Sequence, residues 1–197
     1  MLLDLDCDVL LLTEASERVD LPGYALHLGQ SRMAARRRWA GVASRSAISP
    51  LSDPHPASAM AIVGDWTFCS SILPWRSAGE REFWQGARHA EWTASCLGTL
   101  VPALPTDGLI WGGDWNHALH GREWAGSMGG RTALLTALEK LNLHVPTASL
   151  AHRIDGLLSI DHVAIPTTVS ASGAFRVEAS LGDRRLSDHD AYVVQIG

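Results

Sequence analysis

Cysteine is scarce in this sequence, and basic residues are fewer than acidic ones. Only three cysteines occur among 197 residues, Cys7, Cys69 and Cys96, at a spacing that matches neither a disulfide framework nor a zinc site. We therefore expect reduced thiols in a cytoplasmic protein. The 16 lysines and arginines are outnumbered by 21 aspartates and glutamates. Because a nonspecific nucleic-acid-binding surface is normally basic, any contact with nucleic acid has to come from a local patch or a bound cation.

Long apolar runs, repeats and linkers are also missing. No stretch approaches the length of a membrane span, and the first residues, MLLDLDCD, are too acidic for a signal peptide. No internal repeat or biased linker marks a domain boundary. Hydrophobic residues make up 46% of the chain and charged residues 19%, which allows a substantial core. We expect one domain over residues 1–197, with no membrane partner.

What the sequence does contain is a series of short apolar runs broken by glycine and proline. These predict strands over residues 7–14, 23–30, 39–48, 59–65, 66–74, 108–114, 159–166, 174–181 and 191–196. A helical period of apolar residues predicts two helices, over residues 79–101 and 129–143. The pattern favours an α+β domain in which helices cover sheets.

Polar side chains follow several of the predicted strands at the point where each run ends or begins. They are Glu14, Asp114 with Asn116, Asp161, and Asp188 with His189. Because strand ends meet along one edge of a layered sheet structure, we expect these groups to lie close together. Carboxylates that meet either share a cation or change their pKa values, since like charges repel. Oxygen ligands without cysteine favour Mg²⁺ or Mn²⁺ over Zn²⁺.

Each of these signals is weak when it is taken alone. The stretch GGDWN is more often a turn, SDH is common, and a strand-end glutamate such as Glu14 is more often a surface acid. We interpret His162 as a core histidine. His117, His120 and His144 are interpreted as structural or solvated residues. The order of the motifs along the chain carries more information than any one of them.

In that order the sequence resembles the endonuclease/exonuclease/phosphatase superfamily, whose best-known fold is that of deoxyribonuclease I. The resemblance rests on an acid after an apolar strand (DVLLLTE), a strand ending near Ser-Arg (GVASRSAI), GGDWN, IDHVAIP and LSDHDAYVV. These five segments span residues 8–194. The resemblance implies a four-layer α/β sandwich with two packed, mainly antiparallel sheets and the site at one end of them.

The resemblance also implies roles for single residues. Glu14 would bind a divalent metal, Mg²⁺ or Mn²⁺, and Asp188 would lie at the metal or at a second metal position. Asp114 would orient or deprotonate the attacking water.

The other matched positions would act on the phosphate. Asn116 would hold Asp114 and a phosphate oxygen. His189 would contact the scissile phosphate, and Asp161 would fix its tautomer and favour its cationic form. Hydrolysis of a phosphodiester needs this combination of a positioned water, a cation and a donor to the developing charge.

Two departures from the family pattern matter for the expected site. Family members usually begin with a strand that carries an asparagine near the metal, whereas only MLLDLD precedes CDVLLLTE here. Many nucleases of the family also have a tyrosine or histidine before the first long helix, where this chain has Ile72. Trp75 and Arg76 follow slightly later, and we predict that they bind substrate together with Arg122.

A basic stretch, QSRMAARRRW, offers a further candidate for substrate contact. It concentrates four arginines, Arg32 and residues 36–38, beside Trp39, which would suit phosphate contact and base stacking. A solvated connection explains the stretch equally well.

We interpret the sequence as a metal-dependent phosphodiesterase and, within that class, as a nuclease. A phosphomonoesterase on the same fold and a catalytically weakened binding or regulatory module are the alternatives. The expected partners are a nucleic acid or another phosphoester substrate. Because the strand CDVLLLTE lacks its usual neighbour, we also expect a homo-oligomer, a partner chain or a further segment to complete the sheet.

Overall fold

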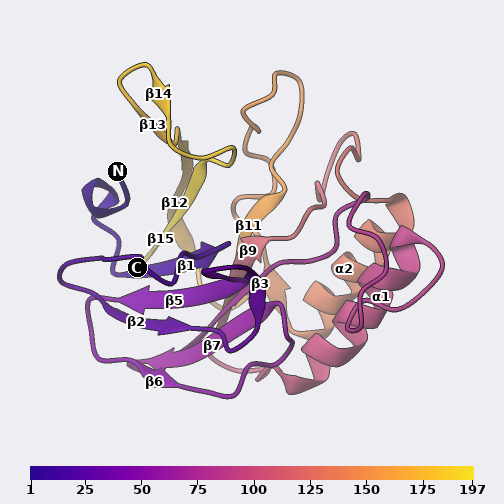
Figure 1. Cartoon of the computed structure of the whole chain (residues 1–197), viewed down its shortest axis with the longest axis horizontal. Helices are drawn as coiled ribbons and strands as arrows, with labels where there is room; N and C mark the ends of the chain where they lie inside the picture. Colours follow the sequence, from indigo (N-terminus) through magenta and orange to yellow (C-terminus); the bar gives the residue numbers. More distant parts are fainter.

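The apolar runs form two main β-sheets in a computed structural model that describes residues 1–197 (Figure 1). The small sheet is antiparallel and has the order β1 (Val9–Thr13), β5 (Ala40–Ser44), β2 (Ala25–Leu28). The large sheet has the order β10 (Leu143–His144), β11 (Asp161–Pro166), β9 (Leu109–Asp114), β8 (Trp66–Ser71), β7 (Ser58–Val63), β6 (Ser49–Pro50). Only β8 and β9 are parallel in it.

The remaining elements extend these sheets or cover them. Strands β12 (Ala171–Val177) and β15 (Ala191–Ile196) form a separate antiparallel pair. Two short hairpins are β3 (Arg32–Ala34) with β4 (Arg37–Arg38) and β13 (Ser180–Leu181) with β14 (Arg184–Arg185). The helices are α1 (His89–Leu100), α2 (Met128–Lys140) and the 3-10 turns η1 (Leu2–Leu5) and η2 (Val101–Ala103). No helix is long and apolar enough to cross a membrane.

The large sheet separates two hydrophobic clusters because successive side chains of a strand point to opposite faces. Phe68 and Ile110 pack toward the small sheet, together with Val42 of β5. Their neighbours along the chain, Cys69 and Trp111, pack with the helices instead. Both strands are therefore buried on their two faces, which is why their sequences read as nearly continuous apolar runs.

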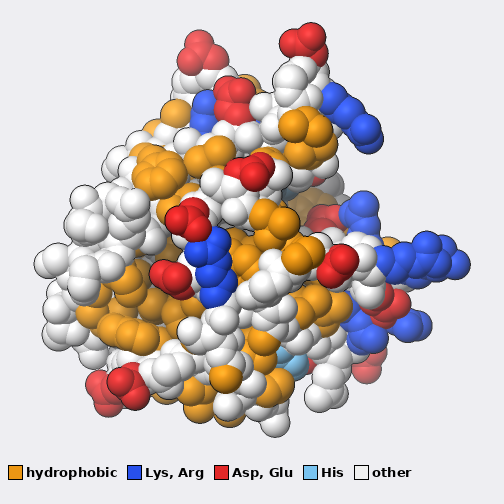
Figure 2. All heavy atoms as spheres, turned by 90° about the vertical axis from the view of Figure 1, so that its left-hand side faces the viewer, with side chains coloured by type: hydrophobic (Ala, Val, Ile, Leu, Met, Phe, Trp, Pro, Cys, Tyr) orange, Lys and Arg blue, Asp and Glu red, His pale blue; other side chains and the backbone are white.

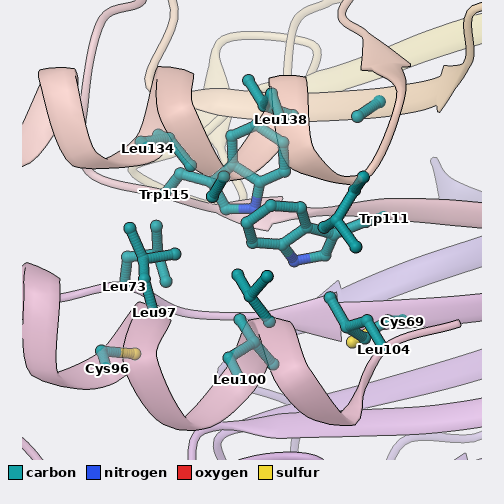
Figure 3. Close-up of a cluster of buried hydrophobic side chains, with 14 of the residues drawn as sticks. Cys69, Leu73, Cys96, Leu97, Leu100, Leu104, Trp111, Trp115, Leu134 and Leu138 are labelled. Atoms are coloured by element: carbon teal, nitrogen blue, oxygen red, sulfur yellow. The ribbon is translucent and has the colours of Figure 1, made fainter. Parts of the chain in front are cut away.

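Leucines of both helices fill the larger cluster (Figure 3). Leu97 of α1 and Leu134 of α2 are almost fully buried there, against the indoles of Trp111 and Trp115. The two indole rings lie 4.4 Å apart between centroids. The Trp111 indole N–H donates to the Ser71 hydroxyl at 2.6 Å, which satisfies its buried polar atom.

Both α-helices cover the same face of the large sheet (Figure 1). The chain has no other α-helix. The structure therefore confirms an α+β arrangement with packed sheets, and it lacks the second helical layer that the expected four-layer sandwich requires. The outer face of the small sheet is left without an α-helix.

The predicted first helix begins ten residues too early. The structure starts α1 at His89, and residues 79–88 form turns. Gly79 and Gly86 have φ values of 73° and 133°, which no right-handed helix contains. Glu91 accepts a hydrogen bond from the Ala87 N–H at 2.8 Å and so favours a helix start at this point.

Most of the predicted strands are present, and two of the predictions are corrected. The stretch QSRMAARRRW contains the β3–β4 hairpin. The sequence did not indicate this hairpin, because a run of three consecutive arginines has no apolar alternation that would predict a strand. The strand predicted over residues 174–181 is divided into β12 and β13. Asp190 causes this break, since its carboxylate accepts the Ala179 N–H that a continuous strand would give to a neighbour.

Two glycines of β9 let this strand pass closely between its neighbours. A Cβ atom on Gly112 would lie 2.6 Å from the His162 carbonyl oxygen, and one on Gly113 would lie 2.2 Å from the Ser71 carbonyl oxygen. Gly113 also has a φ of 126°. The GG of GGDWN is therefore required by the sheet immediately before Asp114.

We predict that Gly113→Ala lowers the free energy of unfolding by roughly 2–4 kcal/mol, from overpacking and backbone strain. Gly98→Ala is the control, because Gly98 lies on the exposed side of α1 and a Cβ atom there would meet no other atom within 4 Å. This control should stabilise the protein by up to about 1 kcal/mol. Urea unfolding measures both, and equal stability of the two variants would contradict the prediction.

Candidate active site

Two aspartates lie side by side at one end of the large sheet because of strand register. Asp114 is the last residue of β9 and Asp161 is the first of β11, and the two are direct partners in the antiparallel ladder. The Ser159 hydroxyl accepts the Asp161 N–H at 3.0 Å and fixes the start of β11. Sequence reasoning predicted that these acids meet, and the register explains how they do.

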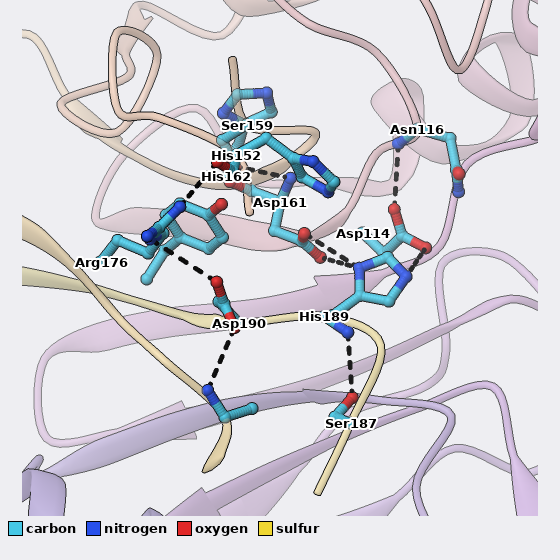
Figure 4. Close-up of polar contacts among 12 residues, drawn as sticks. Asp114, Asn116, His152, Ser159, Asp161, His162, Arg176, Ser187, His189 and Asp190 are labelled. Carbon is cyan, nitrogen blue, oxygen red and sulfur yellow. Dashed lines mark hydrogen bonds and ion pairs between the residues drawn. The ribbon is translucent and has the colours of Figure 1, made fainter. Parts of the chain in front are cut away.

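His189 brings its imidazole between the two carboxylates (Figure 4). Its Nδ1 lies 3.0 Å from both carboxylate oxygens of Asp161, and its Nε2 lies 4.0 Å from Oδ2 of Asp114. The loop that precedes β15 carries this histidine, and the His189 N–H donates to the Ser187 hydroxyl at 3.1 Å. Asp114, Asp161 and His189 form the one group of the structure whose ligand atoms are close enough to share a metal ion.

Burial and charge change the pKa values of this group. Burial, and after it the charge of Asp161, raises the pKa of Asp114 to about 7. Burial alone would lower the pKa of His189, but the hydrogen bond to Asp161 and the charges of Asp161, Asp114 and Asp188 outweigh it and raise the pKa to about 10. Near neutral pH the site therefore contains an imidazolium beside a carboxyl group that is poised between its two protonation states.

Asn116 shapes the turn that holds Asp114 in place. Its backbone has a φ of 54°, and its N–H donates to Oδ1 of Asp114 at 3.1 Å. The Asn116 side-chain amide donates to the Leu73 carbonyl oxygen at 3.1 Å, while the Leu73 N–H donates to the Asp114 carbonyl oxygen at 3.0 Å. Asn116 thus connects the Asp114 carboxylate to the segment that follows β8.

Glu14 lies at the same end of the sheets but outside the group of three. The Ser70 hydroxyl donates to the Leu12 carbonyl oxygen, and Ser70 pairs with Gly112 in the parallel ladder, so the end of β1 is aligned with the end of β9. The Glu14 carboxylate forms an ion pair with Arg37 at 2.8 Å. Its predicted role as a metal ligand requires this ion pair to open.

Asp188 is exposed next to His189 and is also outside the group of three. Its contribution in this structure is its negative charge, which helps to raise the pKa of His189. The predicted position at a metal stays a prediction for this residue.

The predicted substrate-binding residues lie in different surroundings. Trp75 packs in an aromatic cluster with Trp39 and Trp84, and the Arg76 guanidinium donates to the Gly126 carbonyl oxygen at 2.9 and 2.7 Å. These contacts give both side chains a role in holding the local structure. Arg122 is exposed in the loop after Asn116 and makes no ion pair, so it is free to contact a substrate.

In the structure, the basic stretch QSRMAARRRW is not a free loop with its arginines and Trp39 available to a substrate. Trp39 is 2% exposed and cannot stack on a base. Arg32 and Arg38 form ion pairs with Glu17 at 2.8 and 2.7 Å, and Arg37 pairs with Glu14. These arginines stabilise the β3–β4 hairpin against the loop that follows β1.

Sequence reasoning missed several residues that support the site. Ser159, Ser187 and the backbone of Leu73 position the three central side chains, as described above. His152 is buried beside them and packs against Trp124 with ring centroids 4.6 Å apart and ring planes tilted by 53°, and burial lowers its pKa. Ser187 belongs to the SDH motif and could have been found from it. Nothing in the sequence marks His152 or Leu73. His162 is a core histidine as predicted, since it is 1% exposed and burial lowers its pKa to about 4.

The overall fold of this chain is similar to that of solved structures. The endonuclease domain of TRAS1, a telomere-specific non-LTR retrotransposon, matches 98% of this chain and 87% of its own length, with a TM-score of 0.67 and 15% identity. The chain has the endonuclease/exonuclease/phosphatase fold. An endonuclease/exonuclease/phosphatase from Bacteroides vulgatus matches all of this chain and 87% of its own length, with a TM-score of 0.65 and 13% identity.

A third structure with this fold is an endonuclease/exonuclease/phosphatase family protein from Leptotrichia buccalis C-1013-b. It matches 98% of this chain and 89% of its own length, with a TM-score of 0.60 and 11% identity. No protein-family model matches the sequence, and a search of curated proteins gives no match either. The resemblance that the motifs indicated is therefore supported at the level of the endonuclease/exonuclease/phosphatase fold.

The position of His189 gives a direct test of the site geometry. We predict that Asp161→Asn lowers the pKa of His189 by roughly one to three units, because it removes the opposite charge that outweighs burial. The proton that the wild-type imidazole retains up to about pH 10 should then be lost at a lower pH.

An NMR titration of the histidine ring signals measures this, with His189→Gln used to assign the signal. Asp155→Asn is the matched control, since Asp155 is an exposed acid in the loop before β11. An unchanged pKa of His189 in Asp161→Asn would show that the contact with Asp161 is not formed in solution.

Proposed function

We propose that this chain is a divalent-metal-dependent phosphoester hydrolase that cleaves phosphodiesters, with a nucleic acid as the favoured substrate. The observation that carries the proposal is the imidazole of His189 held between Asp161 and Asp114. A cationic donor and a carboxylate of raised pKa at one position suit the attack of water on a phosphoester. The fold shared with endonuclease structures supports the same chemistry by analogy.

Each of the central residues has a distinct task in this proposal. Asp114, with its pKa near 7, accepts a proton from the attacking water. His189 donates a hydrogen bond to a phosphate oxygen as negative charge develops there, and Asp161 keeps the imidazole protonated and oriented. Asn116 holds the Asp114 carboxylate through its backbone N–H.

The donor set also fits a hard divalent cation. Asp114 and Asp161 are adjacent carboxylates whose mutual repulsion contributes to the raised pKa of Asp114, and a cation would relieve that repulsion. Glu14, once Arg37 releases it, would hold Mg²⁺ or Mn²⁺ beside Asp114, while Asp161 keeps its contact with His189. Bound there, the ion would supply Lewis-acid stabilisation of the phosphoryl oxygens.

The choice of substrate depends on the surface around the site. Arg32, Arg37 and Arg38 form ion pairs, and the Arg76 guanidinium is bonded to the Gly126 carbonyl oxygen. Arg36 and Arg122 are the exposed arginines of the two candidate regions whose side chains make no such contact. This smaller positive surface is the observation that favours the second candidate, a phosphomonoesterase acting on small molecules. A nucleic acid remains the first proposal, because Arg122 is exposed in the loop that follows Asn116.

We predict that Asp114→Asn and His189→Ala each reduce hydrolysis by about 10²–10⁴-fold without unfolding the protein. The assay compares single-stranded DNA, double-stranded DNA, RNA and a phosphomonoester, with Mg²⁺ or Mn²⁺ and with a chelator. Asp155→Asn is the control that should keep its activity. Activity that survives complete chelation would contradict the metal requirement, and wild-type rates in folded His189→Ala would contradict the role of His189.

A second prediction concerns Arg122 and separates the two substrate classes. In an inactive Asp114→Asn background, Arg122→Gln should weaken DNA binding and reduce the slope of log affinity against log salt by about one, since one phosphate contact is lost. Lys140→Gln, at the distant end of α2, should change neither quantity. An unaltered slope in Arg122→Gln would show that Arg122 does not contact the phosphate backbone.

A further inference from the structure

Arg81 differs from every other arginine of the chain in its surroundings. It lies in the turns between β8 and α1 and is partly buried, yet its side chain forms neither an ion pair nor a hydrogen bond. The other arginines either have such a partner or are exposed to solvent. Native proteins seldom withdraw a charge from water without pairing it, so this arrangement calls for an explanation.

Three indole rings take the place of an acid beside the Arg81 guanidinium. Its central carbon lies 5.3 Å from the ring centroid of Trp39 and 5.5 Å from those of Trp75 and Trp84. The three rings, which we call the indole cage, also contact one another, with centroids 5.4–6.5 Å apart. An indole face attracts a cation through its quadrupole but carries no net charge. The cage therefore holds the guanidinium without neutralising it.

A shortage of acids does not explain the unpaired charge. The chain has 21 acidic residues for 16 basic ones, and the two sequence neighbours of Arg81, Glu80 and Glu82, are exposed and form no ion pair with it. Arginines elsewhere do have acidic partners, as Arg45 has in Asp6 at 2.7 Å. On the side of the molecule that Figure 2 shows, the basic side chain at the centre of the view stands between acidic side chains.

The nitrogens of Arg81 differ in their access to a ligand. Nε is shut off from solvent and has no acceptor, whereas the two Nη groups are not among the buried unpaired atoms and stay accessible. The backbone is held by a reciprocal pair of hydrogen bonds with Trp84, at 3.2 and 3.0 Å, which fixes the turn that carries the side chain. Arg81 thus presents Nη donors outward from a fixed stem.

The indole cage lies at the catalytic end of the two sheets. The Trp39 carbonyl oxygen accepts the Glu14 N–H at 2.9 Å, so this indole follows directly on the end of β1. Trp75 comes two residues after Leu73, whose N–H donates to the Asp114 carbonyl oxygen at 3.0 Å. The guanidinium is therefore held beside the strand ends that carry Glu14 and Asp114, and it forms no bond with either.

We propose that Arg81 binds a phosphate group of the substrate that flanks the scissile one. A phosphate supplies the negative charge that no residue of the chain supplies, and its oxygens suit the planar donors of a guanidinium. The inference rests on the proposed function for its choice of a nucleic acid, in which further phosphates lie on both sides of the one that is cleaved.

The indole cage has a consequence for affinity. A freely moving arginine loses rotamer entropy when it binds a ligand, whereas a guanidinium packed against three rings has already lost much of it. Trp75, which the sequence predicted to bind substrate, is in this assignment a positioning residue that orients Arg81.

The test measures binding separately from hydrolysis, in an inactive Asp114→Asn background. Fluorescence anisotropy gives the affinity for a short labelled single-stranded DNA, and for its duplex, at several salt concentrations. Arg81→Gln removes the charge, and Arg81→Lys keeps the charge without the planar donor group. Arg88→Gln is the matched control, because Arg88 lies in the same segment, is 81% exposed and already pairs with Glu91 at 2.6 Å. Urea unfolding measures the stability of each variant.

We expect Arg81→Gln to weaken DNA binding by about tenfold and to reduce the slope of log affinity against log salt by about one, since one charged phosphate contact is lost. Arg81→Lys should keep the slope and lose part of the affinity. Arg88→Gln should change neither quantity.

The Nε–H group of Arg81 gives a spectroscopic readout of the same contact. Ring currents of the indole cage should shift its NMR signal upfield, and its burial should slow exchange with water. Arg81→Lys assigns the signal, and added DNA should move it. In the active protein, Arg81→Gln should raise the KM for DNA severalfold more than the KM for a phosphomonoester, which has no flanking phosphate.

Three outcomes would overturn the proposal. The first is an unchanged salt slope in folded Arg81→Gln, which would leave Arg81 as a structural contact of its loop. The second is an equal rise of both KM values, which would place Arg81 at the scissile phosphate, and the third is a parent protein that binds no DNA. Binding that depends on Arg81 in a protein without hydrolytic activity would support the phosphate contact and contradict the hydrolase.

Discussion

The pairing of Asp114 with Asp161 across β9 and β11 is the constraint on which the site depends. Antiparallel register places two carboxylates next to each other at a buried sheet end, and such a pair is unfavourable without a positive charge. His189 supplies that charge from the loop before the last strand. Its contacts with Asp161 and Asp114 therefore hold this loop against β9 and β11 of the large sheet. Burial, and after it the charge of Asp161, raises the pKa of Asp114, and the two carboxylates together keep the imidazole protonated. The structure of this sheet end and its candidate chemistry therefore depend on the same groups.

Much of this arrangement could be predicted from the sequence because its signals are local. Apolar runs located most strands, and the order of GGDWN, IDHVAIP and LSDHD indicated that Asp114, Asp161 and His189 converge. The ion pair of Glu14 with Arg37 could not be predicted, since it depends on a hairpin formed by a run of arginines that reads as a loop. The predicted first helix began too early for a related reason. Its apolar spacing extends back through Gly79 and Gly86, whose positive φ values exclude a helix. Local periodicity does not report such backbone conformations or the distant partners of a charged side chain.

β1 has a neighbouring strand on one edge only. A run of leucines that ends at Glu14 requires cover on both faces and a partner on each edge. The structure provides one edge partner, β5, and leaves the other edge facing a cavity beside β15. The chain combines a well-packed helical side, where Leu97 and Leu134 are buried against tryptophans, with an incompletely covered side. The candidate site lies where these two sides meet, so its surroundings differ in packing from one flank to the other.

The adjacent indoles of Trp111 and Trp115 give this site an optical signature of its own. Their ring centroids lie 4.4 Å apart with the planes tilted by 41°, and Asp114 lies between them in the sequence. Two chromophores at this separation and tilt couple their excited states, and the coupling contributes to near-ultraviolet circular dichroism. Because both rings are fully buried, that signal depends on tertiary packing and not on solvent. Any ligand or substitution that moves the turn at Asp114 would therefore alter an intrinsic spectrum of the protein, with no label attached.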